Sequence, residues 1–512
     1  MSVSDVNARR TGPQQNSGFA LLVVLLLALG VMGVLLVAGL NTGAAQVARN
    51  KSTDEALATA AEALVAYAAG RDFSASTPKP GSLPCPDLND DGFAEPSCGN
   101  ASGSSQQQNR LGRLPWKTLG LPDLRDSNGE RLWYAVSSQF KAATAASVPV
   151  TSQPLGLGTI TLRSSAGVLI HDGRLNDPYL GDAGGAVALV IAPGGVIVRQ
   201  GSTVQQDRSC NGGACNPAGD PAGICTSSPP SLTAKCNPLN YLDVALGEDN
   251  ANFFDNNVTR TSNGNGFIQG PVMVSGALAV NDRIVAITQD QIMSALQRRI
   301  AGETMGCLRL YASANRGRYP WPTPVCQQTP ANSDTWSDHD SVSFGRIPDT
   351  PFDTTAGNSM TNSFGVGECN LYLSWWSDWK RHVFYAVADG YKPAPIASGI
   401  GACTASLSSC LQVQDGVGNI IATGKQVAVI VAGRPLSTTT PPQVRTGNND
   451  GYASNYLEIS NKSLEGLLNS PPPCGSLTPA PVSTPCSPLS SCNKVTSSTR
   501  QSVFNDVVVY YP

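Results

Sequence analysis

The sequence predicts an α+β protein, with a long N-terminal helix followed by two tandem domains that each pack a helix on an antiparallel β-sheet. Residues 19–40 are apolar and uncharged, and a helical pattern continues to about residue 70. A series of short motifs then occurs twice in the same order, which indicates a duplicated domain. Most of the 14 cysteines lie in polar loops, so we expect those loops to be disulfide-bonded.

The apolar run at residues 19–40 is long enough to cross a membrane, because about 20 apolar residues span a bilayer as a helix. Arg9 and Arg10 precede the run. Positive residues favour the cytoplasmic side, so the C-terminal bulk is expected outside the cytoplasm. The expected topology is therefore a single membrane span, with the bulk of the chain on the far side of the membrane from the cytoplasm.

The helix is predicted to continue beyond that span. Leu57, Leu64 and Ala68 recur at helical spacing, and Gly70 is typical of a helix end. The expected organisation has five parts. They are a leader peptide at 1–18, an N-terminal helix at 19–70 with its membrane span at 19–40, a first globular domain at 71–288 and a second at 289–512.

The duplication is visible in seven pairs of motifs. Insertions between them differ in length, but the order is kept, which chance does not readily produce. The pairs begin at Leu64 and Leu308, Leu83 and Tyr319, Gly112 and Gly345, Trp133 and Phe384, Val187 and Val427, Asn240 and Asn455, and Asn281 and Asn505.

Each repeat is predicted to contain short strands rich in Val, Ile, Tyr and Trp, separated by Gly, Asn and Pro. The second repeat has its own helix at about 290–312, which carries Arg298 and Arg299 and is therefore not a second membrane span. A helix followed by consecutive strands favours an antiparallel sheet laid on the helix. The expected strands are 131–136, 159–163, 187–192, 196–199, 283–288, 383–387, 427–432 and 507–511.

The order of polar leader, Gly18, Phe19 and long apolar helix resembles the class III signal of type IV pilins and type II secretion pseudopilins. In that family, prepilin peptidase cuts after the glycine and the new N-terminal phenylalanine is methylated. The resemblance implies a processing site between Gly18 and Phe19, and assembly with other pilins through the N-terminal helix. It also implies a location in the inner membrane of a Gram-negative bacterium, with one span and a periplasmic bulk, and then at the tip of a pilus or pseudopilus. An ordinary signal anchor is the alternative interpretation.

The chain departs from the family pattern at the fifth residue after the junction. Family members usually carry Glu there, and it offsets the buried N-terminal amine of a neighbouring subunit; here the residue is Val23. Leaving a charge without a partner in apolar surroundings is costly. A subunit without this Glu therefore suits the tip of a filament, where no subunit lies ahead.

A candidate calcium site follows the first Pro-rich loop. Oxygen-bearing side chains occupy positions one, three, five and nine of a loop that has Gly92 at position six. This is the front half of a calcium-loop pattern, although position twelve is Cys98. Some pseudopilins bind calcium in a loop; the alternative is a solvated turn. The candidate ligands are Asp87, Asn89, Asp91, Phe93 through its carbonyl, and Glu95.

Disulfide bonds are expected because an exported chain meets an oxidising compartment. Cys85 and Cys98 flank the candidate calcium loop and form one expected bridge. The pairing of the remaining candidates is left open by the sequence. They are Cys210, Cys215, Cys225, Cys236, Cys403, Cys410, Cys474, Cys486 and Cys492.

The sequence gives little sign of an enzyme or of a nucleic-acid partner. Its net charge is −3, and its three histidines do not show a metal-binding spacing. Apart from possible calcium, no cofactor is expected. The chain thus reads as a minor pilin or pseudopilin that primes, caps or decorates a filament tip, with possible adhesive or substrate contact. The alternative is a signal-anchored periplasmic or surface adhesin or enzyme that does not polymerise.

Overall fold

The structure is a computed structural model, and it describes about half of the chain as ordered elements and the loops that join them. The described residues are 47–70, 80–96, 98, 110–137, 140–141, 158–173, 184–200, 205–206, 208, 237–251, 266–325, 336, 342–349, 376–393, 403, 410–436, 443, 445, 453–458, 461, 464, 494–496 and 506–512.

The chain divides into two compact units, Met1–Glu55 and Ala56–Pro512. The first described element is a helix over residues 47–70. Within the larger unit, Leu57, Ala60, Leu64 and Ala68 of this helix are buried. Their spacing of three or four residues places them on one face, as expected for a helix that covers a core.

The first four-stranded sheet has the order β1-β2-β5-β11, and every pair in it is antiparallel. Strands β2 and β5 are buried along their whole length, because they are the two central strands. The strands are β1 (Leu111–Arg113), β2 (Trp133–Val136), β5 (Ala188–Ala192) and β11 (Arg283–Ile287).

The second four-stranded sheet repeats this arrangement with the order β12-β13-β16-β18, again antiparallel throughout. The registers also correspond: Gly112 lies opposite Tyr134, and Gly345 lies opposite Tyr385. Both tyrosine hydroxyls donate to a proline carbonyl of a Pro-rich loop, at 3.1 and 2.7 Å. The strands are β12 (Phe344–Arg346), β13 (Val383–Val387), β16 (Val427–Val431) and β18 (Val507–Tyr511).

Each repeat also has a three-stranded sheet, with the orders β4-β3-β8 and β15-β14-β17. In both, the middle strand pairs antiparallel with one neighbour and parallel with the other. The duplication therefore includes two sheets per repeat. The strands are β3 (Leu162–Arg163), β4 (Leu169–His171), β8 (Phe267–Ile268), β14 (Leu411–Gln414), β15 (Ile420–Lys425) and β17 (Lys494–Thr496).

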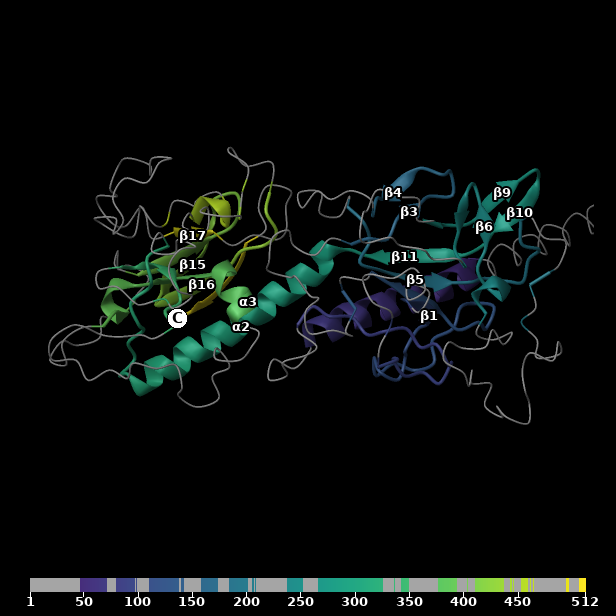
Figure 1. Ribbon diagram of the computed structural model, residues 1–512. Coiled ribbons are helices and arrows are strands. Elements are labelled where there is room, and N and C mark those ends of the chain that lie inside the picture. Colours follow the sequence, from purple (N-terminus) through teal and green to yellow (C-terminus); the bar gives the residue numbers. More distant parts are fainter. Residues whose placement is uncertain are drawn as a thin grey trace, which may run out of the picture. The chain divides into compact units, whose positions relative to one another are not determined.

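Two small hairpins complete the first repeat, and Figure 1 shows them beside β3 and β4. They are β6 (Val244–Ala245) with β7 (Glu248–Asp249), and β9 (Val272–Val274) with β10 (Ala277–Val280). Short 3-10 turns occur at η5 (Pro238–Asn240), η7 (Lys380–His382), η8 (Asp389–Tyr391) and η10 (Ala453–Asn455).

Helix α2 (Gln289–Ala314) follows β11 after one residue and extends through the middle of Figure 1. The Thr288 backbone N–H donates to Oε1 of Gln291 at 2.9 Å, which satisfies a donor at the start of the helix. Ile292, Leu296 and Ile300 lie on its buried face. The helix contacts β16 and β18, so it covers the second four-stranded sheet. A further helix, of one turn, is α3 (Trp376–Trp379).

The predicted fold class was wrong in two respects. Within the described part of the chain, no helix is long and apolar enough to cross a membrane. The strands also do not form one sheet per domain, but are distributed over six sheets of two to four strands among the described residues. The reason is that long polar insertions interrupt the strands, so that several short pairings replace one continuous sheet.

The membrane location is corrected by the same finding, since it rested on a helix that spans the membrane. The expected span at 19–40 and the leader at 1–18 lie outside the described residues. The expected strand at 196–199 is not formed either; Val198 makes only an isolated bridge to Gln205.

Candidate functional site

The candidate calcium loop lies next to the edge strand β1. Asp87 and Arg113 exchange backbone hydrogen bonds of 3.0 and 2.7 Å, which fixes the start of the loop against the sheet. The loop then turns sharply at Asp90 and Gly92, whose φ angles are 64° and 88°. Glycine is required at the second of these positions, because a Cβ on Gly92 would lie 2.7 Å from the ring of Trp116.

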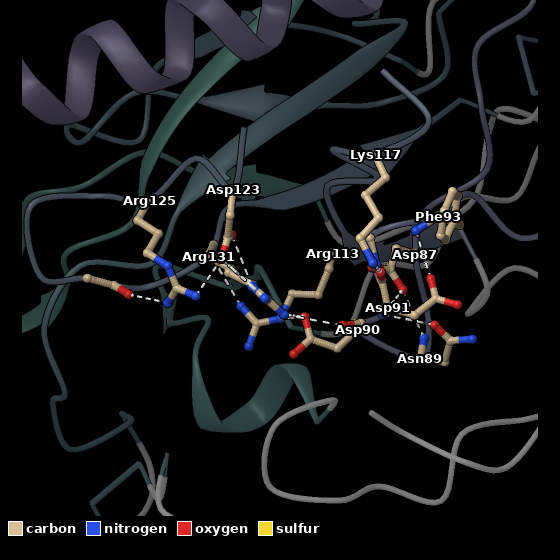
Figure 2. Close-up of polar contacts among 12 residues, drawn as sticks. Asp87, Asn89, Asp90, Asp91, Phe93, Arg113, Lys117, Asp123, Arg125 and Arg131 are labelled. Carbon is tan, nitrogen blue, oxygen red and sulfur yellow. Dashed lines mark hydrogen bonds and ion pairs between the residues drawn. The ribbon is translucent and has the colours of Figure 1, made fainter. Parts of the chain in front are cut away.

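The side chain of Asp87 organises the loop through hydrogen bonds to its backbone (Figure 2). Its Oδ1 accepts from the N–H groups of Asn89 and Asp91, at 3.1 and 3.3 Å. Its Oδ2 accepts from the Gly92 N–H at 2.6 Å. Asn89 and Asp91 each accept in turn from the N–H two residues ahead. The loop is thus a series of side chain-to-backbone turns.

The electrostatics of the loop disfavour a negative charge on Asp87. Burial, together with the nearby negative charges of Asp90 and Asp91, raises the pKa of this carboxyl to about 7, against the hydrogen bonds from the Gly92 and Asp90 backbone. Burial also raises the pKa of Glu95, and Asp91 contributes in the same direction. A bound cation would relieve this like-charge repulsion, so the charge and oxygen chemistry fit calcium.

The basic side chains next to the loop contact atoms other than the predicted calcium ligands. Arg131 forms an ion pair of 3.0 Å with Asp90, which is not a predicted ligand, and Arg113 lies 3.9 Å from the same carboxylate. Lys117 donates to the backbone carbonyl of Asp91, and its ammonium lies 4.9 Å from the centre of the Phe93 ring.

The structure brings Asp87, Asn89 and Asp91 into one turn, and Glu95 reaches back to the Leu88 N–H at 3.4 Å. The Phe93 side chain is exposed. In the described residues, no group of three or more His, Cys, Asp or Glu side chains is placed to hold a metal ion. Calcium at this loop therefore stays a prediction.

The predicted disulfide between Cys85 and Cys98 is confirmed, and it closes the chain around the loop. Cys403 and Cys410, whose pairing was left open, bond to each other. Cys307 in α2 is also disulfide-bonded, although the sequence pattern did not single it out. The other candidates lie outside the described residues: Cys210, Cys215, Cys225, Cys236, Cys474, Cys486 and Cys492.

The predicted processing site, Gly18 and Phe19, also lies outside the described residues, as does Val23. The junction stays a prediction from the sequence.

Sequence reasoning missed a buried arginine in each repeat that stacks on aromatic rings. Arg113 lies 4.3 Å from the ring centre of Trp133 and 4.0 Å from that of Tyr241. Its counterpart Arg346 lies 3.8 Å from Phe384 and 4.5 Å from Tyr456. These stacks are cation–π contacts in a desolvated setting. The signal in the sequence was the arginine that follows Gly112 and Gly345 in the repeated motifs.

A second arginine in each repeat also packs on the same tyrosine, with Arg208 4.9 Å from the ring centre of Tyr241 and Arg445 4.8 Å from that of Tyr456. Arg208 donates to the carbonyls of Asn240, Tyr241 and Gly194. Arg445 makes the same three kinds of contact, with the carbonyls of Asn455, Tyr456 and Gly433. Both arginines therefore satisfy buried backbone acceptors, which is a structural role.

The two described histidines are far from any catalytic arrangement. Nδ1 of His171 contacts the Gly184 carbonyl at 3.2 Å. His382 is fully buried, and its ring packs against Trp379 and Tyr456. Burial, followed by the positive charges of Arg445, Arg346 and Arg381, holds the pKa of His382 well below its usual range. It is therefore neutral and packed as part of the core.

No family model, curated protein or solved structure matches this chain.

Proposed function

We propose that this chain is a large minor subunit of a type IV pilus or type II secretion pseudopilus. It primes, caps or decorates the filament tip, and it acts as a structural component without catalysis. The observation that carries the proposal is the Gly18–Phe19 junction at the start of an uncharged run that ends at residue 40. Its partners are other pilins, bound through the N-terminal segment, and the prepilin peptidase that cuts the junction.

Two structural features support a scaffold role. In each repeat a buried arginine, Arg113 or Arg346, packs on an aromatic ring of the same repeat. The repeats also keep the same strand order in both of their larger sheets. A duplicated frame with filled interiors suits a part that bears and presents surfaces to partners or to a substrate.

We also infer that the loop at 87–95 binds calcium when the ion is present. Asp87, Asn89, Asp91, Glu95 and the carbonyl of Phe93 would hold it. The ion would neutralise the acidic turn and fix it beside β1. This role is structural and adds no chemistry.

The test of the main proposal is the mature N-terminus, read by mass spectrometry of protein purified from cells that assemble the filament. The expected chain begins at a methylated Phe19. Gly18→Leu should leave the leader attached, because the peptidase needs the glycine, whereas the matched variant Gly12→Leu within the leader should be processed normally. A mature wild-type chain that begins at Met1, or beyond Leu40, would overturn the proposal.

A further inference from the structure

In the first repeat, two buried acids, Asp243 and Asp282, each accept a hydrogen bond from a backbone N–H at or next to the other acid. The Asp243 N–H donates to Oδ2 of Asp282 at 2.8 Å, and the Asn281 N–H donates to Oδ2 of Asp243 at 2.8 Å. Asn250 Nδ2 donates to Oδ2 of Asp282 at 2.7 Å, and Gln206 Nε2 to Oδ1 of Asp243 at 2.8 Å. We call these five residues the first carboxyl clamp. It holds the start of β11.

The second repeat has a matching group at the start of β18. The Glu458 N–H donates to Oδ2 of Asp506 at 3.2 Å, and Asn461 Nδ2 donates to the same oxygen at 3.1 Å. Gln443 Nε2 donates to Oε1 of Glu458 at 2.8 Å. These four residues are the second carboxyl clamp. Both clamps therefore secure the last strand of a four-stranded sheet, since β11 and β18 occupy the same sheet position.

Both clamps bury more negative charge than their surroundings balance. Asp282 and Asp506 are fully buried, and within the described structure Oδ1 of each has no hydrogen-bond partner. Each aspartate also has a second buried acid beside it, Asp243 or Glu458. Two adjacent carboxylates in an apolar interior repel each other, and one of them is expected to keep its proton.

The charged groups around the first clamp are two arginines, and both are shared with other partners. Arg208 reaches the clamp through Oε1 of Gln206, at 2.9 Å, and it lies 3.4 Å from Glu130. Arg199 forms an ion pair with Asp249. Both arginines therefore also contact other acids, and they balance the charge of Asp243 and Asp282 only in part.

The second clamp is surrounded in the same way. Arg445 reaches it through Oε1 of Gln443, at 3.2 Å. His382 packs on Tyr456 nearby but is neutral, because burial keeps its pKa well below the usual range. Oδ1 of Asp506 has no hydrogen-bond partner within the described residues, and Arg445 contacts this clamp only through Gln443.

Burial and like charge act in one direction on these acids. Burial raises the pKa of Asp282 well above its usual range, and Asp243 adds to the effect against the hydrogen bonds from Asn250 and the Asp243 backbone. Burial raises the pKa of Asp243 to about 6, opposed by the Asn281 N–H, Gln206 and the two arginines. Burial, then Glu458, raises the pKa of Asp506 well above its usual range.

We propose that each carboxyl clamp retains a proton in the folded protein, so that the last strand of each four-stranded sheet is held tightly in acid and loosened in alkali. The proton removes the charge repulsion between the two acids and lets the orphaned oxygen remain buried. Its loss leaves two buried negative charges, which favours separation of the strand from residues 241–243 or 456–458.

The direction of the pH effect follows from linkage. An unfolded aspartate loses its proton near pH 3.9, whereas the clamped pair loses it at a higher pH. The clamp's contribution is therefore complete below about pH 4 and is lost as the pH rises through the folded pKa values, which begin at about 6 for Asp243. In this window the folding equilibrium constant is expected to fall by up to about tenfold per pH unit for each retained proton.

The test is urea unfolding of the full chain between pH 5 and pH 9, for the wild type and for Asp282→Asn and Asp506→Asn. Asparagine keeps an oxygen acceptor at each site but has no proton to lose. Each variant should therefore reduce the pH slope of the folding constant by up to tenfold per pH unit. Asp415→Asn is the matched control, because Asp415 lies in an exposed turn and accepts from Asn419; it should leave the slope unchanged.

A second measurement on the wild type keeps the proposal testable if a variant fails to fold. Infrared or carboxyl-carbon NMR spectra at pH 7 should show protonated carboxylic acids, and these signals should disappear on unfolding. Fully ionised carboxyls at pH 7, or an unchanged pH slope in both folded variants, would overturn the proposal.

Discussion

The side chain of Arg346 shows how one residue explains a repeated motif. The guanidinium packs on the rings of both Phe384 and Tyr456, and the residue is fully buried. Its backbone pairs with Thr323 in both directions, at 2.9 and 2.8 Å. Arg113 pairs with Asp87 in the same way. The two repeats therefore share one way of attaching a Pro-rich loop to an edge strand, and only the first has acids at that point.

Calcium binding can be tested at this scale. The wild type should melt at a higher temperature in calcium than in chelator. Calcium should raise the free energy of unfolding by RT ln(1 + [L]/Kd), about 2.7 kcal/mol at a ligand concentration of 100 Kd. Asp91→Ala should remove this increment, because it removes a carboxylate from the turn. Calorimetry with and without chelator measures both.

The matched control for that experiment is Asp415→Ala in the β14–β15 hairpin. Asp415 accepts from the N–H groups of Val417 and Asn419, as the loop aspartates do from theirs. Its loss should lower stability equally in calcium and in chelator. Identical wild-type melting curves in the two conditions would leave the 87–95 loop as a turn that binds no ion.

At the scale of elements, close approach of backbones decides where glycine is needed. A Cβ on Gly345 of β12 would lie 2.1 Å from the Thr323 carbonyl oxygen, so the strand and the Pro-rich loop would have to separate. Gly345→Ala should therefore destabilise the protein by about 1–3 kcal/mol, as overpacking does. Urea unfolding measures the loss.

Gly306→Ala is the matched control for this strand contact. Gly306 lies inside α2, and a Cβ there would meet nothing within 4 Å. Alanine in the interior of an exposed helix face is favourable by about 0.5–1 kcal/mol over glycine. Equal effects of the two substitutions would contradict the close-approach argument.

The same scale shows what the sequence could predict. The strands at 383–387 and 507–511 have the bounds expected from their runs of Val, Phe and Tyr, and α2 differs from its expected range by one or two residues. Both strands are continuous apolar runs, the first buried throughout and the second half-buried, and such runs give a strong local signal. The three-stranded sheets could not be predicted, because β8 and β17 pair with strands that are distant in sequence.

The candidate site was predictable to a similar degree. The spacing of Asp87, Asn89 and Asp91 gave the turn and its flanking disulfide. It could not give the arginines beside Asp90 or the paired acids of the clamps. Those groups meet only after folding brings residues 243 and 282, or 458 and 506, together.

At the scale of the whole molecule, the duplication bears on the filament role that we propose. Two sets of sheets follow one N-terminal segment, so a subunit attached through that segment alone would be bulky for a filament. Val23 adds a second constraint. It offers no charge to the N-terminal amine of a subunit placed ahead, and an amine without a partner in apolar surroundings is costly.

Both constraints lead to one expected position. A subunit that cannot receive another ahead of it should be rare in the filament and lie at one end. Antibodies raised against residues 289–512 and labelled with gold should therefore mark single fibre ends. Val23→Glu should bring no gain in assembly, because no amine occupies that position at the tip. Labels spread along the whole fibre, or longer and more numerous fibres with Val23→Glu, would contradict the tip position, since either result requires neighbours on both sides of this subunit.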